Sequence, residues 1–316
     1  MPIYLTESDV AGLLTMRDAL RLVAQAARAI ADGSGTNAPR QRLKAQSATL
    51  HVLPASLGGR LGHKVYTGAP RGAKFWFTLY AETGEMLAMI EADRLGQIRT
   101  GAASGVATDF MARANARSLG VIGTGWQAAS QIEAVCVARP IERVRVWGRD
   151  PERLANFCTT MTAKLARPIE PGAGPRDVIE GADVVVTMTS ASRPVFEGTW
   201  LQPGTHVNAA GSNRVTAQEI DVETVRRASI VALEDLAQAR VESGDLRAAS
   251  EAGVFRWLDA VRLADIVAGT IAGRSSADEI TLFESLGVGI WDLAVGSFVY
   301  DAAVENGIGT PLPFAG

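Results

Sequence analysis

Cysteine and histidine are both scarce in this chain, which has two cysteines and three histidines among 316 residues. Two cysteines cannot build the disulfide framework of a small secreted protein, and Cys136 and Cys158 lie in segments with helical periodicity. We therefore expect buried thiols in a reducing compartment. The histidines, His51, His63 and His206, include no pair at the spacing of metal ligands, which argues against a protein-bound metal.

Strong charge bias and long apolar runs are also missing. The formal net charge is -3 and the basic residues are scattered, so no footprint for a nucleic acid is visible. No apolar run is long enough to cross a bilayer, and the first residues do not form a basic segment followed by an apolar one. The sequence therefore predicts a cytoplasmic protein that binds neither nucleic acid nor membrane.

A glycine-rich turn between a strand-like run and a helical pattern is the most informative feature that the chain does have. It reads Gly123-Thr-Gly125-Trp-Gln-Ala128 and follows the apolar run 118–122. In a dinucleotide-binding turn Gly123 permits the tight bend, Gly125 lets the backbone approach a pyrophosphate, and Ala128 lets the helix pack closely on its strand. The sequence therefore predicts a nucleotide site, in which Trp126 and Gln127 also contact the cofactor.

The end of the next strand indicates which nucleotide fits. A second strand-like run, 143–147, arrives about twenty residues later, where a βαβ unit reaches the adenosine ribose. The run ends in Gly148-Arg149-Asp150, with no acid at the tip of the strand. Gly148 leaves room for a 2′-phosphate and Arg149 supplies a permanent charge for it, which favours NADP(H) over NAD(H). In the alternative, Arg149 is a solvated loop charge and Asp150 turns inward to hold the ribose.

The order of patterns along the chain predicts the fold class. A helix at 16–31 has Thr15 as its cap, and short strands with glycine turns from 43 to 90 indicate a small antiparallel sheet. A helical segment at 91–114 leads into alternating strands and helices, which predict a Rossmann-type doubly wound parallel sheet in an α/β protein with a second α+β domain. The carboxyl ends of such strands line the ligand cleft. They are expected to contribute the residues Thr189, Gly211, Ser212 and Asn213.

Several phrases together resemble the ornithine cyclodeaminase and mu-crystallin family over nearly the whole chain. They are Pro39-Arg40, Gly62-His-Lys64, Glu82-Thr-Gly84, Ile98-Arg99-Thr100-Gly-Ala-Ala-Ser, Gly123-Thr-Gly-Trp-Gln127 and Thr281-Leu-Phe-Glu-Ser285-Leu-Gly287. The resemblance implies a substrate-binding and dimerising domain, here 1–114 with 300–316, and a nucleotide domain, here 115–299. The protein is then expected to be a homodimer, with Thr100 and Ser285 from these phrases at the cofactor.

The resemblance also implies roles for three basic residues. In the family, the positions that match Arg40 and Lys64 contact an amino-acid substrate, and the one that matches Arg99 lies near cofactor and substrate. A guanidinium can grip a substrate carboxylate through two hydrogen bonds and so orient the α-carbon for hydride transfer. Lys64 is expected to exchange the proton, because nearby positive charges lower the pKa of its ammonium group. Arg42 lies two residues from Arg40 and is an alternative carboxylate ligand.

One departure from the family bears on the reaction. Cyclodeaminases carry an aspartate where this chain has Asn213, and an amide cannot neutralise the side-chain ammonium of ornithine. We therefore expect a reductase of α-imino or α-keto acids, such as a cyclic ketimine carboxylate, or a dehydrogenase of the matching amino acid. Two alternatives are an ornithine cyclodeaminase that recycles its NAD and a crystallin-like protein that only binds NADPH. The segment 68–77 is also shorter than the usual family loop and offers Trp76 and Phe77 as an apolar wall or as sheet core.

Overall fold

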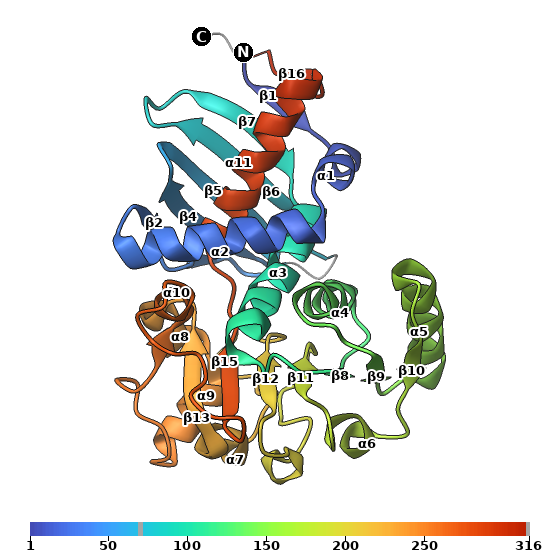
Figure 1. Cartoon of the computed structure of the whole chain (residues 1–316). Coiled ribbons are helices and arrows are strands. Elements are labelled where there is room, and N and C mark those ends of the chain that lie inside the picture. Colours follow the sequence, from blue (N-terminus) through green and yellow to red (C-terminus); the bar gives the residue numbers. More distant parts are fainter. Residues whose placement is uncertain (69–71, 314–316) are drawn as a thin grey trace. The chain divides into compact units, whose positions relative to one another are not determined.

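The computed structural model of the chain describes residues 1–68 and 72–313, and it divides into two compact units (Figure 1). Unit 1 comprises residues 1–100 and 287–316, and unit 2 comprises residues 101–286. The predicted shortened loop after Gly68 falls partly outside the described residues, as do the last three residues of the predicted C-terminal segment.

Unit 1 is built on one mixed sheet, in the strand order β16-β1-β7-β6-β5-β4-β2 with β3 paired to β4. The strands from β2 to β7 pair antiparallel, which confirms the antiparallel sheet predicted from the sequence, whereas β1 runs parallel to β7. The elements of this unit are β1 (Ile3–Leu5), α1 (Glu7–Leu13), α2 (Met16–Asp32), β2 (Gly35–Asn37), β3 (Gln41–Lys44), β4 (Thr49–Leu57), β5 (Arg60–Gly68), β6 (Phe75–Ala81), β7 (Met86–Glu91), the first part of α3 (Asp93–Met111), α11 (Gly289–Asn306) and β16 (Thr310–Pro311).

Helices α2 and α11 pack together and α11 lies on the sheet (Figure 1). Thr15 caps α2 through its side chain, as the sequence predicts, and Gly33 ends the helix in the left-handed conformation. Phe77 is fully buried, and a Cβ on Gly62 would lie 2.6 Å from its ring, so this aromatic side chain is sheet core. The close fit between Phe77, the sheet and α11 fixes the position of β5, which carries Lys64.

Unit 2 contains a wholly parallel sheet in the order β10-β9-β8-β11-β12-β15-β13-β14. Along β11, Val184 and Val186 belong to one hydrophobic cluster and Val185 to another, so both faces of the sheet are covered. This confirms the doubly wound prediction. The elements are β8 (Ser118–Ile122), α4 (Trp126–Ala138), β9 (Arg143–Trp147), α5 (Pro151–Leu165), β10 (Ile169–Pro171), α6 (Pro175–Ile179), β11 (Val184–Thr187), η1 (Gly198–Trp200), β12 (His206–Ala209), α7 (Val222–Arg227), β13 (Ala228–Leu233), α8 (Leu236–Glu242), α9 (Gly244–Glu251), β14 (Val261–Arg262), α10 (Leu263–Val267) and β15 (Ile280–Glu284).

The boundaries of the two units differ from the ones expected at 114/115 and 299/300. The first boundary falls inside α3, because Thr108 in its second half accepts a hydrogen bond from Asn208 of unit 2. The second boundary comes earlier because the whole of α11 packs on α2, β4 and β5. As a result, residues 287–299 belong with the N-terminal segment, and they bring an acidic residue, Asp292, to that unit.

Both cysteines lie in helices, as the sequence predicts. Cys158 is buried and Cys136 is partly buried, and both are free thiols in helices. Burial raises the pKa of each thiol, so both side chains are held in the unreactive protonated form at neutral pH. Across residues 1–68 and 72–313, no helix combines the length and the apolar character that spanning a membrane requires.

Candidate functional site

The predicted nucleotide turn connects β8 to α4 in unit 2. Gly123 has a positive φ of 127°, and a Cβ there would lie 2.2 Å from the carbonyl oxygen of Met188, so only glycine fits. Gly125 is the N-cap of α4, and no side chain caps the helix there. A Cβ added to Gly125 would meet no atom within 4 Å. The first N–H groups of a thirteen-residue helix therefore face an open approach, which suits a phosphate group.

A cavity of 760 Å³ lies at the carboxyl edge of this sheet. The glycine turn forms its middle, the end of β9 with Arg149 forms one side, and the loops after β11 and β12 form the other. The predicted cofactor residues that line it are Gly123, Gly125, Trp126, Gln127, Arg149, Thr189 and Gly211. The structure thus brings seven of the predicted residues to one cavity, on both sides of the strand-order switch at β8.

Five other predicted cofactor residues lie outside the lining of this cavity. Ala128 is fully buried beneath the turn, where it packs in the core between α4 and β8. The Thr100 hydroxyl donates to the carbonyl of Gly96 within α3, and Ser285 is buried and donates to Glu234. The remaining two residues are Ser212 and Asn213, which follow Gly211.

The end of β9 offers little room for an acidic side chain. A Cβ on Gly148 would lie 2.8 Å from the methyl group of Thr124. Asp150 also lines the cavity and is the N-cap of α5, where one oxygen of its carboxylate accepts the backbone N–H of Arg153 at 3.1 Å. Arg149 is exposed and lines the cavity, together with Arg153, which the sequence reading did not single out. Two guanidinium groups therefore border this end of the cavity.

Unit 1 holds the second set of predicted residues, around the carboxylate of Asp292. Lys64 on β5 is 2% exposed, and its Nζ lies 2.9 Å from Asp292 Oδ1. Arg99 on α3 donates from Nε to the same oxygen at 3.0 Å. Asp292 is completely buried in the first turn of α11, where the helix dipole also favours a negative charge. Among the described residues, its second oxygen has no hydrogen-bond partner.

Arg40 joins the same cluster through the chain segment that precedes α11. It is 7% exposed and donates from Nη2 to the carbonyl of Gly287 at 2.9 Å and from Nη1 to the hydroxyl of Tyr66 at 2.8 Å. Gly287 has a positive φ of 75°, and a Cβ on it would lie 2.7 Å from Arg99 Nη1. Arg42, the alternative, is partly exposed on β3. The structure therefore gathers Lys64, Arg99 and Arg40 in one buried group.

The charge of this group is strongly unbalanced, because two guanidinium groups and one amine surround a single carboxylate. Burial lowers the pKa of Lys64 from 10.5 to about 7, and the charges of Arg99 and then Arg40 act in the same direction against the opposing effect of Asp292. Lys64 can therefore gain or lose a proton near neutral pH. The excess positive charge suits a small anionic ligand.

Three aromatic rings border this cationic group, none of them singled out from the sequence as a site residue. Phe75 has its ring centre 5.9 Å from Lys64 Nζ, and Tyr66 lies between Phe75 at 4.6 Å and His51 at 4.3 Å. Burial, with the charges of Arg40 and Arg42, lowers the pKa of His51 to about 4, so its imidazole is neutral at physiological pH. The rings provide a flat apolar boundary beside the cations.

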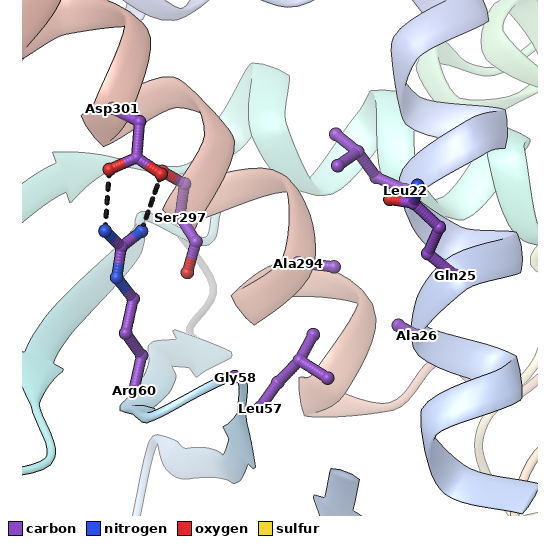
Figure 2. Close-up of a pocket in the computed structure, with 9 residues that line it drawn as sticks. All are labelled: Leu22, Gln25, Ala26, Leu57, Gly58, Arg60, Ala294, Ser297 and Asp301. Carbon is purple, nitrogen blue, oxygen red and sulfur yellow. Dashed lines mark hydrogen bonds and ion pairs between the residues drawn. The ribbon is translucent and has the colours of Figure 1, made fainter. Parts of the chain in front are cut away.

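A cavity of 420 Å³ in unit 1 lies between α2, α11 and the turn that joins β4 to β5 (Figure 2). Arg60 pairs there with Asp301 through both Nη atoms, at 2.9 and 2.6 Å (Figure 2). The Asp301 side chain is exposed, whereas that of Arg60 is partly buried. No predicted site residue lines this cavity.

Comparison with known proteins identifies relatives that match over most of the chain. A Delta(1)-pyrroline-2-carboxylate reductase of Bacillus cereus is 41% identical over 277 residues, which cover 84% of this chain and 85% of that protein. The solved structure of the Thermococcus litoralis Delta(1)-pyrroline-2-carboxylate reductase, in complex with NADH and L-proline, is 32% identical with a TM-score of 0.94. The match covers 98% of this chain and 100% of the chain in that structure.

The iminosuccinate reductase of Paracoccus denitrificans, solved in complex with NAD+, is 28% identical with a TM-score of 0.93 and covers 99% of both chains. The model of the ornithine cyclodeaminase/mu-crystallin family matches residues 2–307, almost the whole sequence. The resemblance found in the motifs is therefore confirmed, and this chain belongs to the ornithine cyclodeaminase/mu-crystallin family.

Proposed function

We propose that this protein is an NAD(P)-dependent oxidoreductase that reduces a small α-imino acid to the amino acid, with a cyclic ketimine carboxylate such as pyrroline-2-carboxylate as substrate. The observation that carries the proposal is the buried group of Lys64, Arg99 and Arg40 around one carboxylate. Its excess positive charge fits a carboxylate ligand, and its amine has a pKa of about 7. Relatives named as reductases of pyrroline-2-carboxylate and iminosuccinate support the same substrate class.

Arg40 is the proposed ligand of the substrate carboxylate. Its guanidinium is already oriented by Tyr66 and the carbonyl of Gly287, so little conformational freedom is lost when an anion binds. Arg99 is held by Asp292 and adds positive charge. The neighbouring rings of Tyr66 and Phe75 match the flat, apolar faces of a cyclic imine. Together these groups hold the substrate in one orientation, which hydride transfer requires.

Lys64 is the proposed proton donor in the reduction. Its ammonium group transfers a proton to the imine nitrogen, and the amine that results takes a proton back from solvent after the amino acid leaves. Asp292 holds Nζ in place and favours its protonated form. In the reverse direction the neutral amine accepts the proton from the amino acid. Lys64 can therefore act as the acid in reduction and as the base in oxidation, and it returns to its starting protonation state after each turnover.

The cavity of unit 2 fits a nicotinamide dinucleotide, whose bound form supplies or accepts the hydride. Gly123, Gly125 and the start of α4 would hold the pyrophosphate, since their backbone N–H groups have an open approach. The cofactor assignment rests on this fit and on relatives solved with NADH and NAD+.

A direct assay tests the function. With pyrroline-2-carboxylate or piperideine-2-carboxylate, the absorbance of NADPH is expected to fall steadily as the imine is reduced. A flat trace with every imino and keto acid would contradict the proposal. If the protein instead converts ornithine to proline and ammonia with catalytic NAD, the activity is that of a cyclodeaminase.

The preference for NADP(H) is a separate proposal that rests on Arg149. Replacing Arg149 with alanine is expected to lower kcat/KM for NADPH by about 10- to 100-fold, because a charge-assisted hydrogen bond to the 2′-phosphate is worth about 1.5–3 kcal/mol. The value for NADH should change little. Arg143→Ala at the exposed start of β9 is the matched control, since it removes an equal charge at the other end of the strand. Equal losses with both cofactors would contradict the assignment.

We also propose that the protein is a homodimer and that it is located in the cytoplasm. An archaeal alanine dehydrogenase solved as a dimer with bound NAD is 30% identical to this chain with a TM-score of 0.93. Sedimentation of the purified protein would test the dimer.

A further inference from the structure

The loops on one side of the nucleotide cavity are tied together by Glu219, a residue that lines neither the cavity nor the cationic group. Its side chain is 1% exposed. One oxygen accepts the backbone N–H of Thr189 at 2.6 Å and the Thr189 hydroxyl at 2.7 Å, and the other accepts the backbone N–H of Gly211 at 2.6 Å and the Thr187 hydroxyl at 3.1 Å. One carboxylate thus joins the end of β11 to the end of β12.

The four donors match an ionised carboxylate. The Thr189 hydroxyl accepts the N–H of Ala191, which directs its own hydrogen toward Glu219. Two of the other donors are backbone N–H groups, which cannot reverse their direction. Burial raises the pKa of Glu219, while its hydrogen bonds to Thr189, Gly211 and Thr187 act in the opposite direction. A neutral amide in this place would necessarily turn an NH₂ group toward a backbone N–H.

The backbone of Glu219 is also fixed by hydrogen bonds. Its N–H donates to Asp245 at 2.8 Å, and its carbonyl accepts the N–H of Val195 at 2.9 Å. Val195, Thr189 and Gly211 all line the cavity. A Cβ on Gly211 would lie 2.4 Å from the Thr189 nitrogen and 2.5 Å from a Glu219 oxygen, so the two loops are packed without spare room. A single buried residue therefore fixes the positions of three segments that line this side of the cavity.

The strand order indicates which part of the cofactor would lie beside the loops after β11 and β12. In a doubly wound sheet the strand after the glycine turn reaches the adenosine ribose, and here that strand is β9. Strands β11 and β12 lie on the other side of β8, so their loops are opposite the adenosine end. If the pyrophosphate binds at the glycine turn, the nicotinamide half would lie beside the loops that Glu219 joins.

We propose that Glu219 is a positioning residue that shapes the nicotinamide end of the cavity by holding the Thr189 and Gly211 loops at a fixed separation. It does not touch the cofactor. The inference rests on the proposed nucleotide function and deepens it, because it separates the residues that set nicotinamide binding from those that set adenosine binding.

The test is Glu219→Gln in the full-length protein, with two ligands measured by titration. The affinity for NADPH is expected to fall by about tenfold, since the amide leaves one backbone N–H facing another donor and moves a loop. The affinity for 2′-phospho-ADP-ribose, which lacks the nicotinamide half, should stay within about twofold of the wild type.

Asp183→Asn supplies a matched control. Asp183 also accepts two backbone N–H groups and a hydroxyl, from Arg117 and Ser118, and its other oxygen pairs with Arg113. It lies just before β11, at the amino end of that strand. This variant should lower Tm without changing the affinity for either ligand. If Glu219→Gln weakens both ligands equally, or neither, the positioning role is wrong. If the wild type binds no nicotinamide cofactor at all, the proposed function fails as well.

Discussion

Replacing Lys64 with methionine is expected to lower kcat for imine reduction by about 10²- to 10⁴-fold, the usual contribution of a positioned general acid. Methionine retains the length and the apolar stem of the side chain but has no proton to transfer. Arg99 still pairs with Asp292 in this variant, so the carboxylate keeps a partner and the fold should survive. The measurement is kcat with pyrroline-2-carboxylate alongside the dissociation constant for NADPH, which should not change.

Lys44→Met is the control for this experiment, since Lys44 is exposed on β3 and its charge lies in solvent. It should leave kcat within about twofold of the wild type, as expected of a solvated surface charge. A Lys64→Met enzyme as active as this control would remove the proton donor from the mechanism.

The pH dependence provides a second readout of the same residue. Because the pKa of Lys64 is about 7, its protonated form is lost as the pH rises through neutrality. Reduction needs that form, so kcat for reduction should fall there, whereas kcat for oxidation of the amino acid should rise over the same range. The same response to pH in both directions would conflict with a single shared acid and base.

Local pattern was sufficient to predict much of the fold. The strand at 143–147 and the start of the helix at Met16 were predicted at the residues where the structure has them, because both depend on neighbours in the chain. Thr15 and Gly33 act as caps through their own backbone and side-chain chemistry. The cavity residues near the glycine turn also follow from local rules, since the ends of adjacent parallel strands meet at one edge.

Long-range pairing could not be predicted in the same way. Asp292 lies in the apolar helix 289–306, and its partner Lys64 is 228 residues away in the sequence. The available signal was a single acid in the apolar stretch 288–300 of that helix, because a buried charge requires a partner, but that signal does not name the partner. The boundary at residues 286/287 was missed for the same reason, since it depends on what α11 packs against. Ser285 was placed at the cofactor from the resemblance alone, whereas the structure buries it against Glu234.

Removal of the Asp292 carboxylate should have the largest effect on stability. Asp292→Ala leaves Arg99 and Lys64 buried without their shared anion, and breaking a buried ion pair in this way costs about 3–5 kcal/mol. Lys64 can relieve part of the cost by losing its proton, because its pKa falls further without the carboxylate. Arg99 cannot do so, since a guanidinium stays charged at any accessible pH. The free energy of unfolding, measured by urea denaturation, should therefore drop substantially.

Asp301→Ala is the matched comparison, since it removes the same residue type from the same helix. Asp301 also pairs with an arginine, Arg60, but its side chain is 51% exposed, and a solvated ion pair is worth about 0–1 kcal/mol. Similar losses in the two variants would mean that burial of the Asp292 cluster has no special cost.

In Asp292→Asn, any activity that remains should need a lower pH for reduction, because Lys64 then holds its proton less tightly. A pH profile unchanged from the wild type would show that Asp292 does not control the proton on Lys64.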